Sequence, residues 1–185
     1  MTNAMDRFVL LRLAREAITA YVHHQPMPLI ELEGVFARPG GAFVTLHRHG
    51  DLRGCIGHIE ANEPLGEVIA RCAVAACSRD PRFPPVTEPE LAELELELSL
   101  LGPLEAITGA DEIEIGTHGL VVEQGWHRGL LLPQVATEWK WDREAFLAHT
   151  CQKAGLPVDA WKKGARLWRF SAEVFGEEKR AGGAG

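Results

Sequence analysis

One run of eleven residues limits the possible folds more than any other part of the chain. In residues 91–101, LAELELELSLL, leucine alternates with glutamate or serine, and the alternating leucines are Leu94, Leu96, Leu98 and Leu100. Successive side chains of a β-strand point to opposite faces, so this run predicts a strand with one face in a core and one polar face. Glu95 and Glu97 on the polar face either meet solvent or line a site as acid, base or ligand.

Residues 34–60, GVFARPGGAFVTLHRHGDLRGCIGHIE, predict further strands. The turn sequences PGG and HGD divide the segment into three short β-prone runs, which indicates a three-stranded antiparallel meander. A tight turn about Gly50 and Asp51 would place Cys55 opposite Leu46 on the neighbouring strand.

Helical patterns flank these strands. Apolar residues recur at spacings of three and four over residues 6–23, and proline or capping signals begin further helices near residues 64, 133 and 142. A hairpin near QGW and a last strand at residues 165–175 complete the order. Hairpins dominate and no strand–helix–strand repeat is present, so we expect an α+β fold with a mainly antiparallel sheet flanked by helices.

The segment SRDPRFPPVTEPE, residues 78–90, contains four prolines and no apolar period, which excludes a long regular element. We nevertheless predict an ordered loop. Asp80 and Arg82 offer local hydrogen bonds or a salt bridge, and Phe83 is expected to pack against the sheet as one wall of a cleft.

Composition narrows the function classes. The 185 residues fit a single domain, or a domain with a small lobe. A net charge of -7 argues against nucleic acid as the main partner. Charged residues interrupt every apolar run at the N-terminus, so we expect a cytoplasmic protein that does not enter a membrane. The cysteines are irregularly spaced and are expected to be free thiols: Cys55, Cys72, Cys77 and Cys151.

In the sequence DLRGCIGHIE, Cys55 is surrounded by residues that can take part in binding or catalysis. On the register described above, Arg53 and Arg48 are paired on the face of Cys55 and would lower the pKa of its thiol. Gly54 and Gly57 would leave backbone N–H groups open to a substrate oxygen. Two opposed arginines repel unless an anion lies between them, and that anion is either a protein carboxylate or a ligand.

Histidines are candidate bases for the thiol. His58 is three residues from Cys55, which places it on the opposite face of a regular strand unless Gly57 permits a bulge. His118, in GTHGL, is the alternative and would reach the site only through the tertiary fold. Cys55 and His58 have a spacing that can begin a zinc site, but no second ligand pair follows at a suitable distance. We therefore predict no metal and no cofactor.

Six motifs occur in the order seen in the AMMECR domain family, which is named after the chromosomal region of Alport syndrome, midface hypoplasia, intellectual disability and elliptocytosis. They are LRGCIG at 52–57, DPRFPPV at 80–86, ELELSLL at 95–101, GTHGLVVE at 116–123, GLLLPQVA at 129–136 and FLAHTCQKAGL at 146–156. The chain resembles this family over residues 5–176.

The resemblance implies one domain of two lobes over residues 5–176, followed by a flexible tail at 177–185. In it a larger antiparallel-sheet lobe carries a smaller lobe, and LRGCIG lies near a cleft between them. Prokaryotic relatives are associated with Memo-like proteins, which are similar to extradiol dioxygenases, and with radical SAM proteins. These are the expected partner proteins. The family's activity is unsettled, so the resemblance assigns no catalytic residue.

Two function classes remain open. In the first, the protein is an enzyme or enzyme-system subunit acting on a small anionic or carbonyl compound, with Cys55 as nucleophile and Arg53 as anion clamp. In the second, it is a ligand-binding or adaptor module with an inert Cys55. Arg53 either stays available to a ligand or pairs with Glu95 or Glu97. The candidate catalytic residues are Cys55 and His118, and the candidate ligand-binding residues are Arg53, Gly54, Gly57, Arg48 and Glu95.

Overall fold

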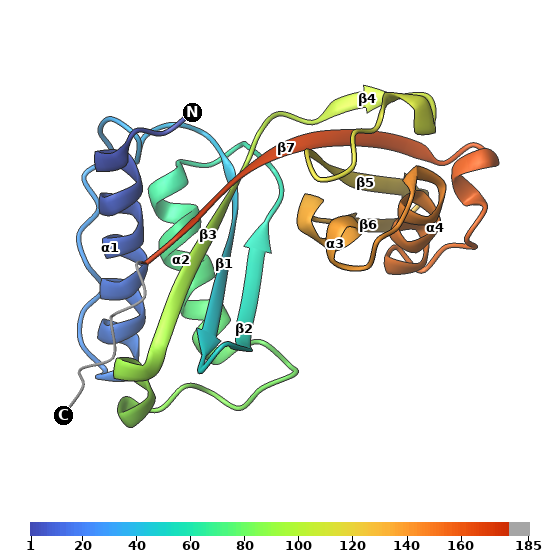
Figure 1. Cartoon of the computed structure of the whole chain (residues 1–185). Helices are drawn as coiled ribbons and strands as arrows, with labels where there is room; N and C mark the ends of the chain where they lie inside the picture. Colours follow the sequence, from blue (N-terminus) through green and yellow to red (C-terminus); the bar gives the residue numbers. More distant parts are fainter. Residues whose placement is uncertain (178–185) are drawn as a thin grey trace. The chain divides into compact units, whose positions relative to one another are not determined.

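The computed structural model describes residues 1–177 (Figure 1). The described chain forms two compact units: unit 1 contains Met1–Leu101 and residues 173–177, and unit 2 contains Gly102–Ala172. Strands pair in antiparallel fashion and helices flank them, so the predicted α+β class is confirmed. The predicted tail lies outside the described residues except for Glu177, whose N–H donates to the Leu96 carbonyl at 2.9 Å.

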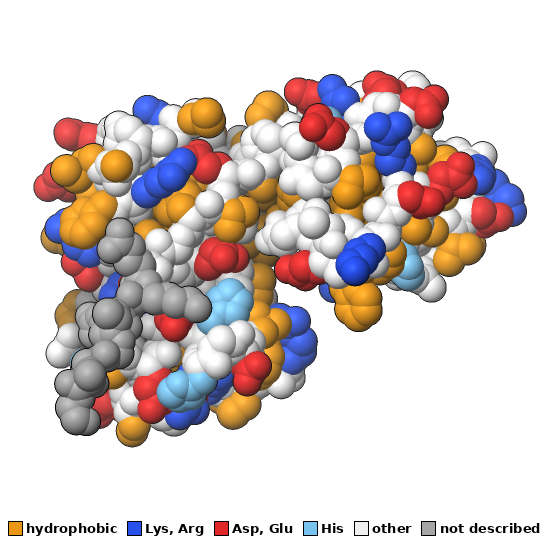
Figure 2. All heavy atoms as spheres, in the orientation of Figure 1, with side chains coloured by type: hydrophobic (Ala, Val, Ile, Leu, Met, Phe, Trp, Pro, Cys, Tyr) orange, Lys and Arg blue, Asp and Glu red, His pale blue; other side chains and the backbone are white. Residues whose placement is uncertain are grey.

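Charged side chains are mixed on the visible surface. On the face that Figure 2 shows, Lys and Arg are scattered among Asp and Glu rather than gathered into one patch. No helix within residues 1–177 is long and apolar enough to cross a membrane.

Unit 1 is a small sheet with two helices on one face. The strand order is β2-β1-β3, and the end of β7 lies beside β3. Its helices and strands are α1 (Ala4–Val22), β1 (Gly41–Arg48), β2 (Asp51–His58), α2 (Leu65–Ser78), a 3₁₀-helix (Glu88–Glu93), β3 (Leu94–Leu101) and the last residues of β7 (Arg166–Gly176).

The first strand of the predicted meander does not form. Gly34 has a left-handed φ of 54°, and the backbone carbonyls of Phe36 and Arg38 accept hydrogen bonds from Gly66 and Leu65 at the start of α2. This stretch therefore supports the helix start, and the second neighbour of β1 is β3 instead. The meander prediction was wrong because β-prone residues were taken as a strand without a pairing partner.

The hairpin between β1 and β2 turns one residue earlier than predicted. His49 and Gly50 have φ values of 54° and 86°, and Arg48 pairs with Asp51. Two successive left-handed residues are the geometry of a type I′ turn, whose twist matches the strands. The predicted turn at Gly50 and Asp51 was wrong.

A bulge then shifts the register once more. Leu46 pairs with Gly54 while His47 pairs with Leu52, so Arg53 has no partner on β1. An extra residue on one strand re-aims the side chains around it. The face on which Arg53 lies could not follow from simple alternation.

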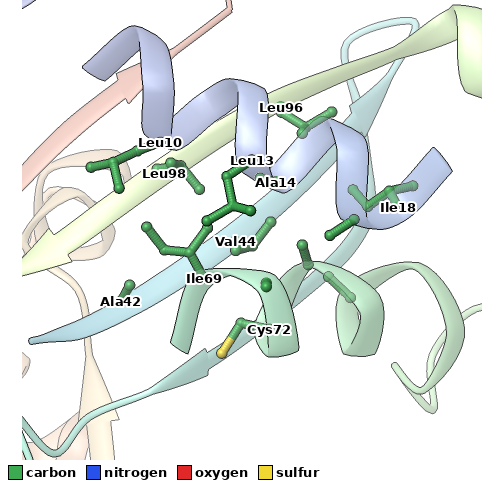
Figure 3. Packing of buried hydrophobic residues seen from close by; sticks show 14 of the residues in the cluster. Leu10, Leu13, Ala14, Ile18, Ala42, Val44, Ile69, Cys72, Leu96 and Leu98 are labelled. Carbon is green, nitrogen blue, oxygen red and sulfur yellow. The ribbon is translucent and has the colours of Figure 1, made fainter. Parts of the chain in front are cut away.

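The core of unit 1 lies between the sheet and its two helices (Figure 3). The labelled residues come from α1 (Leu10, Leu13, Ala14, Ile18), β1 (Ala42, Val44), α2 (Ile69, Cys72) and β3 (Leu96, Leu98). The predicted alternation of β3 is confirmed, since its leucines are buried in this core. The opposite face of the sheet is called here the polar face. It carries the polar side chains Thr45, His47, Cys55, Glu95, Glu97 and Ser99, together with the ring of Phe43.

Unit 2 is built on a sheet with the order β6-β5-β7-β4. Besides β7 it contains β4 (Glu105–Ile107), β5 (His118–Gln124), β6 (His127–Leu131), α3 (Pro133–Glu138) and α4 (Arg143–Lys153), with 3₁₀ turns at Ala110–Glu112 and Ala160–Lys162. The hairpin at QGW and the helix starts at Pro133 and Asp142 are as predicted, and the Asp142 carboxylate accepts the Ala145 N–H at 2.8 Å. Phe146 and Leu147 of α4 pack against Leu120 and Val122 of β5 in its core.

Candidate functional site on the sheet of unit 1

Strand pairing places three members of the polar face in one row. Thr45 on the middle strand pairs with Cys55 of β2 on one side and with Glu97 of β3 on the other. The neighbour of Cys55 is thus Thr45, not the predicted Leu46. In the next row along β1, His47 pairs with Glu95. The turn and the bulge together produced this correction.

Cys55 is half-buried, and its Sγ lies 3.2 Å from Thr45 Oγ. Burial raises the pKa of the thiol. The Thr45 hydrogen bond and the charge of Arg82 act in the opposite direction, the charges of Asp80 and Glu97 add to the rise, and the net pKa is above 9.0. The thiol is therefore neutral near pH 7, because the charged form is disfavoured.

The predicted lowering of this pKa by Arg53 and Arg48 was wrong. Arg53 donates from Nε and Nη2 to Glu90 at 2.9 and 3.2 Å, and from Nη1 to the Pro84 carbonyl at 2.9 Å. Arg48 donates from Nη1 to the same carboxylate at 3.0 Å and from Nε to Glu93. The anion between the two arginines is a protein carboxylate.

These groups form what we call the Glu90 cluster: Arg48, Arg53, Pro84, Glu90 and Glu93. Glu90 is buried and also accepts the N–H of Thr87 at 2.8 Å. The hydrogen bonds from Arg53 lower the pKa of Glu90 to about 2. The Arg53 side chain is only 12% exposed, and its carboxylate partner is Glu90 rather than the predicted Glu95 or Glu97.

Close packing requires glycine at both glycine positions of LRGCIG. A Cβ at Gly54 would overlap the Ala76 carbonyl oxygen of α2, and one at Gly57 would overlap the ring of Phe43. The N–H of Cys55 donates outward to Asp80 Oδ2 at 2.9 Å. Since N–H directions alternate along a strand, the N–H of Gly54 points toward β1 and that of Gly57 points outward. Of the two N–H groups predicted to face a substrate, only that of Gly57 has a suitable direction.

Asp80 ties the proline-rich loop to the motif. Its carboxylate is buried and accepts, besides the Cys55 N–H, the N–H of Arg82 at 3.1 Å and the guanidinium Nε and Nη2 at 3.0 and 2.7 Å. These hydrogen bonds, above all those of Arg82, hold the pKa of Asp80 well below its usual range. The predicted local salt bridge is confirmed.

The same loop brings a different arginine, Arg82, close to the thiol. Arg82 is the guanidinium whose charge acts on Cys55, and it also lies 5.4 Å from the centre of the half-buried Phe83 ring. The role of Phe83 as a cleft wall stays a prediction. An Asp-Pro-Arg sequence signals an Asp side chain bonded to the N–H two residues on. Its contact with Cys55 is tertiary and has no local signal.

The predicted histidines lie apart from the thiol's contacts. His58 Nε2 is 3.3 Å from Glu63 Oε1 and 3.4 Å from Asn62 Oδ1. His118 belongs to unit 2, where its Nδ1 accepts the Glu114 N–H at 3.0 Å, and its role as a base stays a prediction. Within residues 1–177 no three His, Cys, Asp or Glu side chains are grouped closely enough to hold a metal ion.

Several members of the polar face have no internal partner. Across residues 1–177, His47, Glu95 and Glu97 are half-buried and make neither a hydrogen bond nor an ion pair. Ser99 is fully buried, and its Oγ has no hydrogen-bond partner in the described chain. His47 and Ser99 were not among the predicted site residues, although the alternation of residues 94–101 already placed Ser99 on this face.

The fold and the motif-bearing strand define an α+β protein built on antiparallel strands, with a helix-covered face and a polar face in unit 1. The AMMECR1 family model matches residues 11–175, and the chain belongs to this family, as the resemblance predicted.

The relatives agree with this assignment over nearly full length. A protein of Methanothermobacter thermautotrophicus is 46% identical over 178 residues, which cover 91% of this chain and 93% of the relative. A protein of Methanosarcina barkeri is 44% identical over 182 residues, 93% and 90% of the two chains. The crystal structure of the uncharacterized protein PH0010 from Pyrococcus horikoshii has a TM-score of 0.85 and 43% identity, covering 92% and 90%. Family and fold are thus shown, and the activity has to be argued from the site.

Proposed function

We propose that the chain is a ligand-binding subunit whose polar face in unit 1 receives a small carbonyl or carboxylate compound beside Cys55. The observation that carries the proposal is the row of Cys55, Thr45 and Glu97 within a group of half-buried polar side chains. Polar groups removed from water are normally hydrogen-bonded. A bound ligand would supply the missing partners.

Arg82 is the proposed contact for the carbonyl or carboxylate end. Its side chain is 55% exposed, and its charge acts on the Cys55 thiol. Nε and Nη2 bind Asp80, which orients the guanidinium while leaving the Nη1 side for a ligand. Arg53, by contrast, uses all three nitrogens within the Glu90 cluster and supports the strand.

A second candidate is an enzyme in which Cys55 attacks the carbonyl carbon. Glu97 favours it, since this carboxylate is close enough to influence the thiol's pKa and has no other partner within residues 1–177. As the S–C bond forms, the thiol proton would pass to Glu97, and the carbonyl electron pair would move to an oxygen stabilised by Arg82. The raised pKa of Cys55 favours the binding role over this one.

The pH dependence of alkylation by iodoacetamide distinguishes the binding role of Cys55 from the nucleophile role. The rate at Cys55 is followed by mass spectrometry of the modified peptide, with Cys55→Ser as the blank. The binding role predicts slow modification at neutral pH and a rate still rising above pH 9.0, the ordinary value for a thiol. A fast rate that reaches its plateau near pH 7 would establish the nucleophile.

The ligand itself is tested with acetate, propionate and butyrate in a ¹⁵N NMR titration. Saturable shifts around Cys55 and Arg82 are expected in the wild type. Arg82→Gln should abolish them and Arg82→Lys should retain part of them, because lysine keeps the charge without the planar fork. Saturable binding that is equal in all three proteins would refute the role of Arg82.

The proposal also includes partner proteins. The family resemblance suggests Memo-like and radical SAM proteins, and a binding subunit would deliver its ligand to such a catalytic partner. Co-purification of this chain with those proteins, retained in wild type and in Cys55→Ser, is the expected result. Failure of the partners to co-purify with either protein would count against delivery.

A further inference from the structure

An open groove of about 430 Å³ lies on the outer side of α2, where the end of α1 and the segment after it meet this helix. Its apolar lining is formed by Tyr21, Met27, Pro28, Ile30, Ala70 and Val74. Ile30 packs at the N-terminal end of α2, since a Cβ added to Gly66 would come within 2.9 Å of its side chain. The groove is separate from the polar face, because α1 and α2 cover the opposite side of the sheet (Figure 3).

Apolar side chains project beside this groove. Leu29 is 98% exposed, although its neighbours in the sequence, Pro28 and Ile30, both line the groove. Met27 and Leu32 of the same segment are exposed as well. One exposed apolar residue is ordinary, but several of them next to an apolar groove mark an interaction surface. The segment therefore offers a protruding side chain directly beside a groove that could receive one.

The groove also carries one charge of each sign. Glu67 stands in the first turn of α2 and Arg79 directly after its last residue, and both line the groove. α2 has 14 residues, so the two positions are about 18 Å apart along the helix axis. Both side chains are exposed, and neither makes a hydrogen bond or an ion pair with any residue in 1–177. Arg71, between them, is occupied, since it donates to the Glu63 carboxylate at 2.6 and 3.0 Å.

This arrangement is complementary to itself. A two-fold axis near the middle of α2 places the helices of two copies antiparallel and exchanges their ends. Glu67 of each copy then lies opposite Arg79 of the other, so opposite charges meet at both ends of the contact. The same rotation brings Leu29 of each copy to the apolar groove of the other. A different partner would need both charges in reversed order and an apolar side chain of its own, whereas a second copy supplies them by symmetry.

We infer that the chain forms a two-fold symmetric homodimer through α2 and residues 27–32. The contact buries Leu29 and pairs the two charges that the single chain leaves open, Glu67 and Arg79. The dimer goes beyond the proposed function and does not depend on it, because the polar face lies on the other side of the sheet in each copy.

Sedimentation velocity tests the dimer. The wild type is measured from about 1 µM to about 500 µM, since small interfaces bind in the micromolar range, and it should change from monomer to dimer. Glu67→Arg and Arg79→Glu each place like charges opposite one another at both ends of the contact, and each should raise the dissociation constant at least about tenfold. Glu138→Arg and Arg143→Glu reverse exposed charges of unit 2 that have no ion pair in residues 1–177, and they should leave the constant unchanged.

A mixture of the two weakened variants tests the symmetry itself. In a dimer of one Glu67→Arg chain and one Arg79→Glu chain, the introduced arginine faces the introduced glutamate. The native Arg79 and the native Glu67 face each other at the other end. Opposite charges are then restored at both contacts, so the mixture should form dimers at concentrations where each variant alone is monomeric. Such dimers would also show that both variants are folded.

Leu29→Ser tests the apolar contact. The side chain is almost fully exposed in the single chain, so folding is not at risk, and the loss of two apolar contacts per dimer should raise the dissociation constant about tenfold or more. A wild type that stays monomeric over the whole concentration range would overturn the inference. So would a dimer that survives both charge reversals, a mixture no more dimeric than its two components, or a dimer that Leu29→Ser leaves unchanged.

Discussion

The Glu90 cluster and the polar face lie in the same unit and use the same kinds of side chain, yet one is complete and the other is open. In the cluster, Arg53 and Arg48 share the Glu90 carboxylate, and the Pro84 carbonyl takes the remaining donor of Arg53. On the polar face, Glu95 and Glu97 have no partner among residues 1–177.

This difference separates charges that hold the fold together from charges that can meet a ligand within one unit. A buried charge that is fully paired holds the strand and loop together, and removing one partner leaves the other uncompensated. A half-buried charge without a partner contributes little to folding and stays available to a ligand. Arg53, the charged residue of LRGCIG, thus holds the fold together, while Glu97 belongs to the candidate site.

The largest expected effect is on stability, from neutralising Glu90. Glu90→Gln leaves the nearly buried Arg53 without its carboxylate and should lower the free energy of unfolding by about 3 to 5 kcal/mol. The matched change Glu97→Gln should alter it by less than about 0.5 kcal/mol. Urea unfolding of the two variants measures both, and equal losses would erase the distinction between cluster and polar face.

Acid should reveal the same difference in the wild type. The pKa of Glu90 is lowered to about 2 in the folded chain, against 4.5 ordinarily, so its ionised form stabilises the fold above pH 4.5. That contribution should be lost as the pH falls from 4.5 toward 2, and the shift corresponds to about 3 kcal/mol. Unfolding free energy is measured against pH, and the loss over this window should be smaller by that amount in Glu90→Gln. An unchanged acid slope in the variant would contradict the assignment.

A smaller effect concerns the motif's glycines. Gly54→Ala places a Cβ against the Ala76 carbonyl of α2 and should cost about 1 to 3 kcal/mol, as overpacking does. Gly109→Ala is the control, since no heavy atom lies within 4 Å of its added Cβ. Thermal unfolding compares the two. A harmless Gly54→Ala would mean that this glycine serves a ligand rather than the approach of the helix.

Sequence reasoning reached the fold class because its signals are local. The alternation of residues 94–101 predicts both faces of β3, and the proline and Asp142 signals predict the helix starts. The face of Arg53 depends on two single-residue events, a turn at His49 and Gly50 and a bulge at Arg53 itself. Moving the turn by one residue shifts the β1 partner of Cys55 by two positions, from Leu46 to Val44, and keeps the face. The bulge then shifts the partner by one, to Thr45, and a one-residue step reverses the face of a side chain.

The partners of the site residues were even harder to predict from the sequence. Asp80 lies near the start of the proline-rich segment and Glu90 at its end, in the 3₁₀-helix, so their contacts with Cys55 and Arg53 arise only when this segment folds along β2. The direction of the pKa shift of Cys55 could not be predicted for the same reason. It is set mainly by burial, and a sequence motif does not show how deeply a residue is buried. Ser99 was within reach, because its place on the polar face follows from period two alone.

The smallest expected effect on stability is a gain, whereas the changes above are expected to reduce stability. The Ser99 hydroxyl is buried without a hydrogen bond in the described chain, so it contributes desolvation cost and no compensating bond. Ser99→Ala should therefore leave the free energy of unfolding unchanged or raise it by up to about 1 kcal/mol. Urea unfolding measures this, with Thr45→Val as the comparison, because Thr45 Oγ has the Cys55 thiol as its partner and its loss should not stabilise. A clear loss of stability in Ser99→Ala would show that the hydroxyl has a partner in the folded protein, and the polar face would then be a completed structure like the Glu90 cluster.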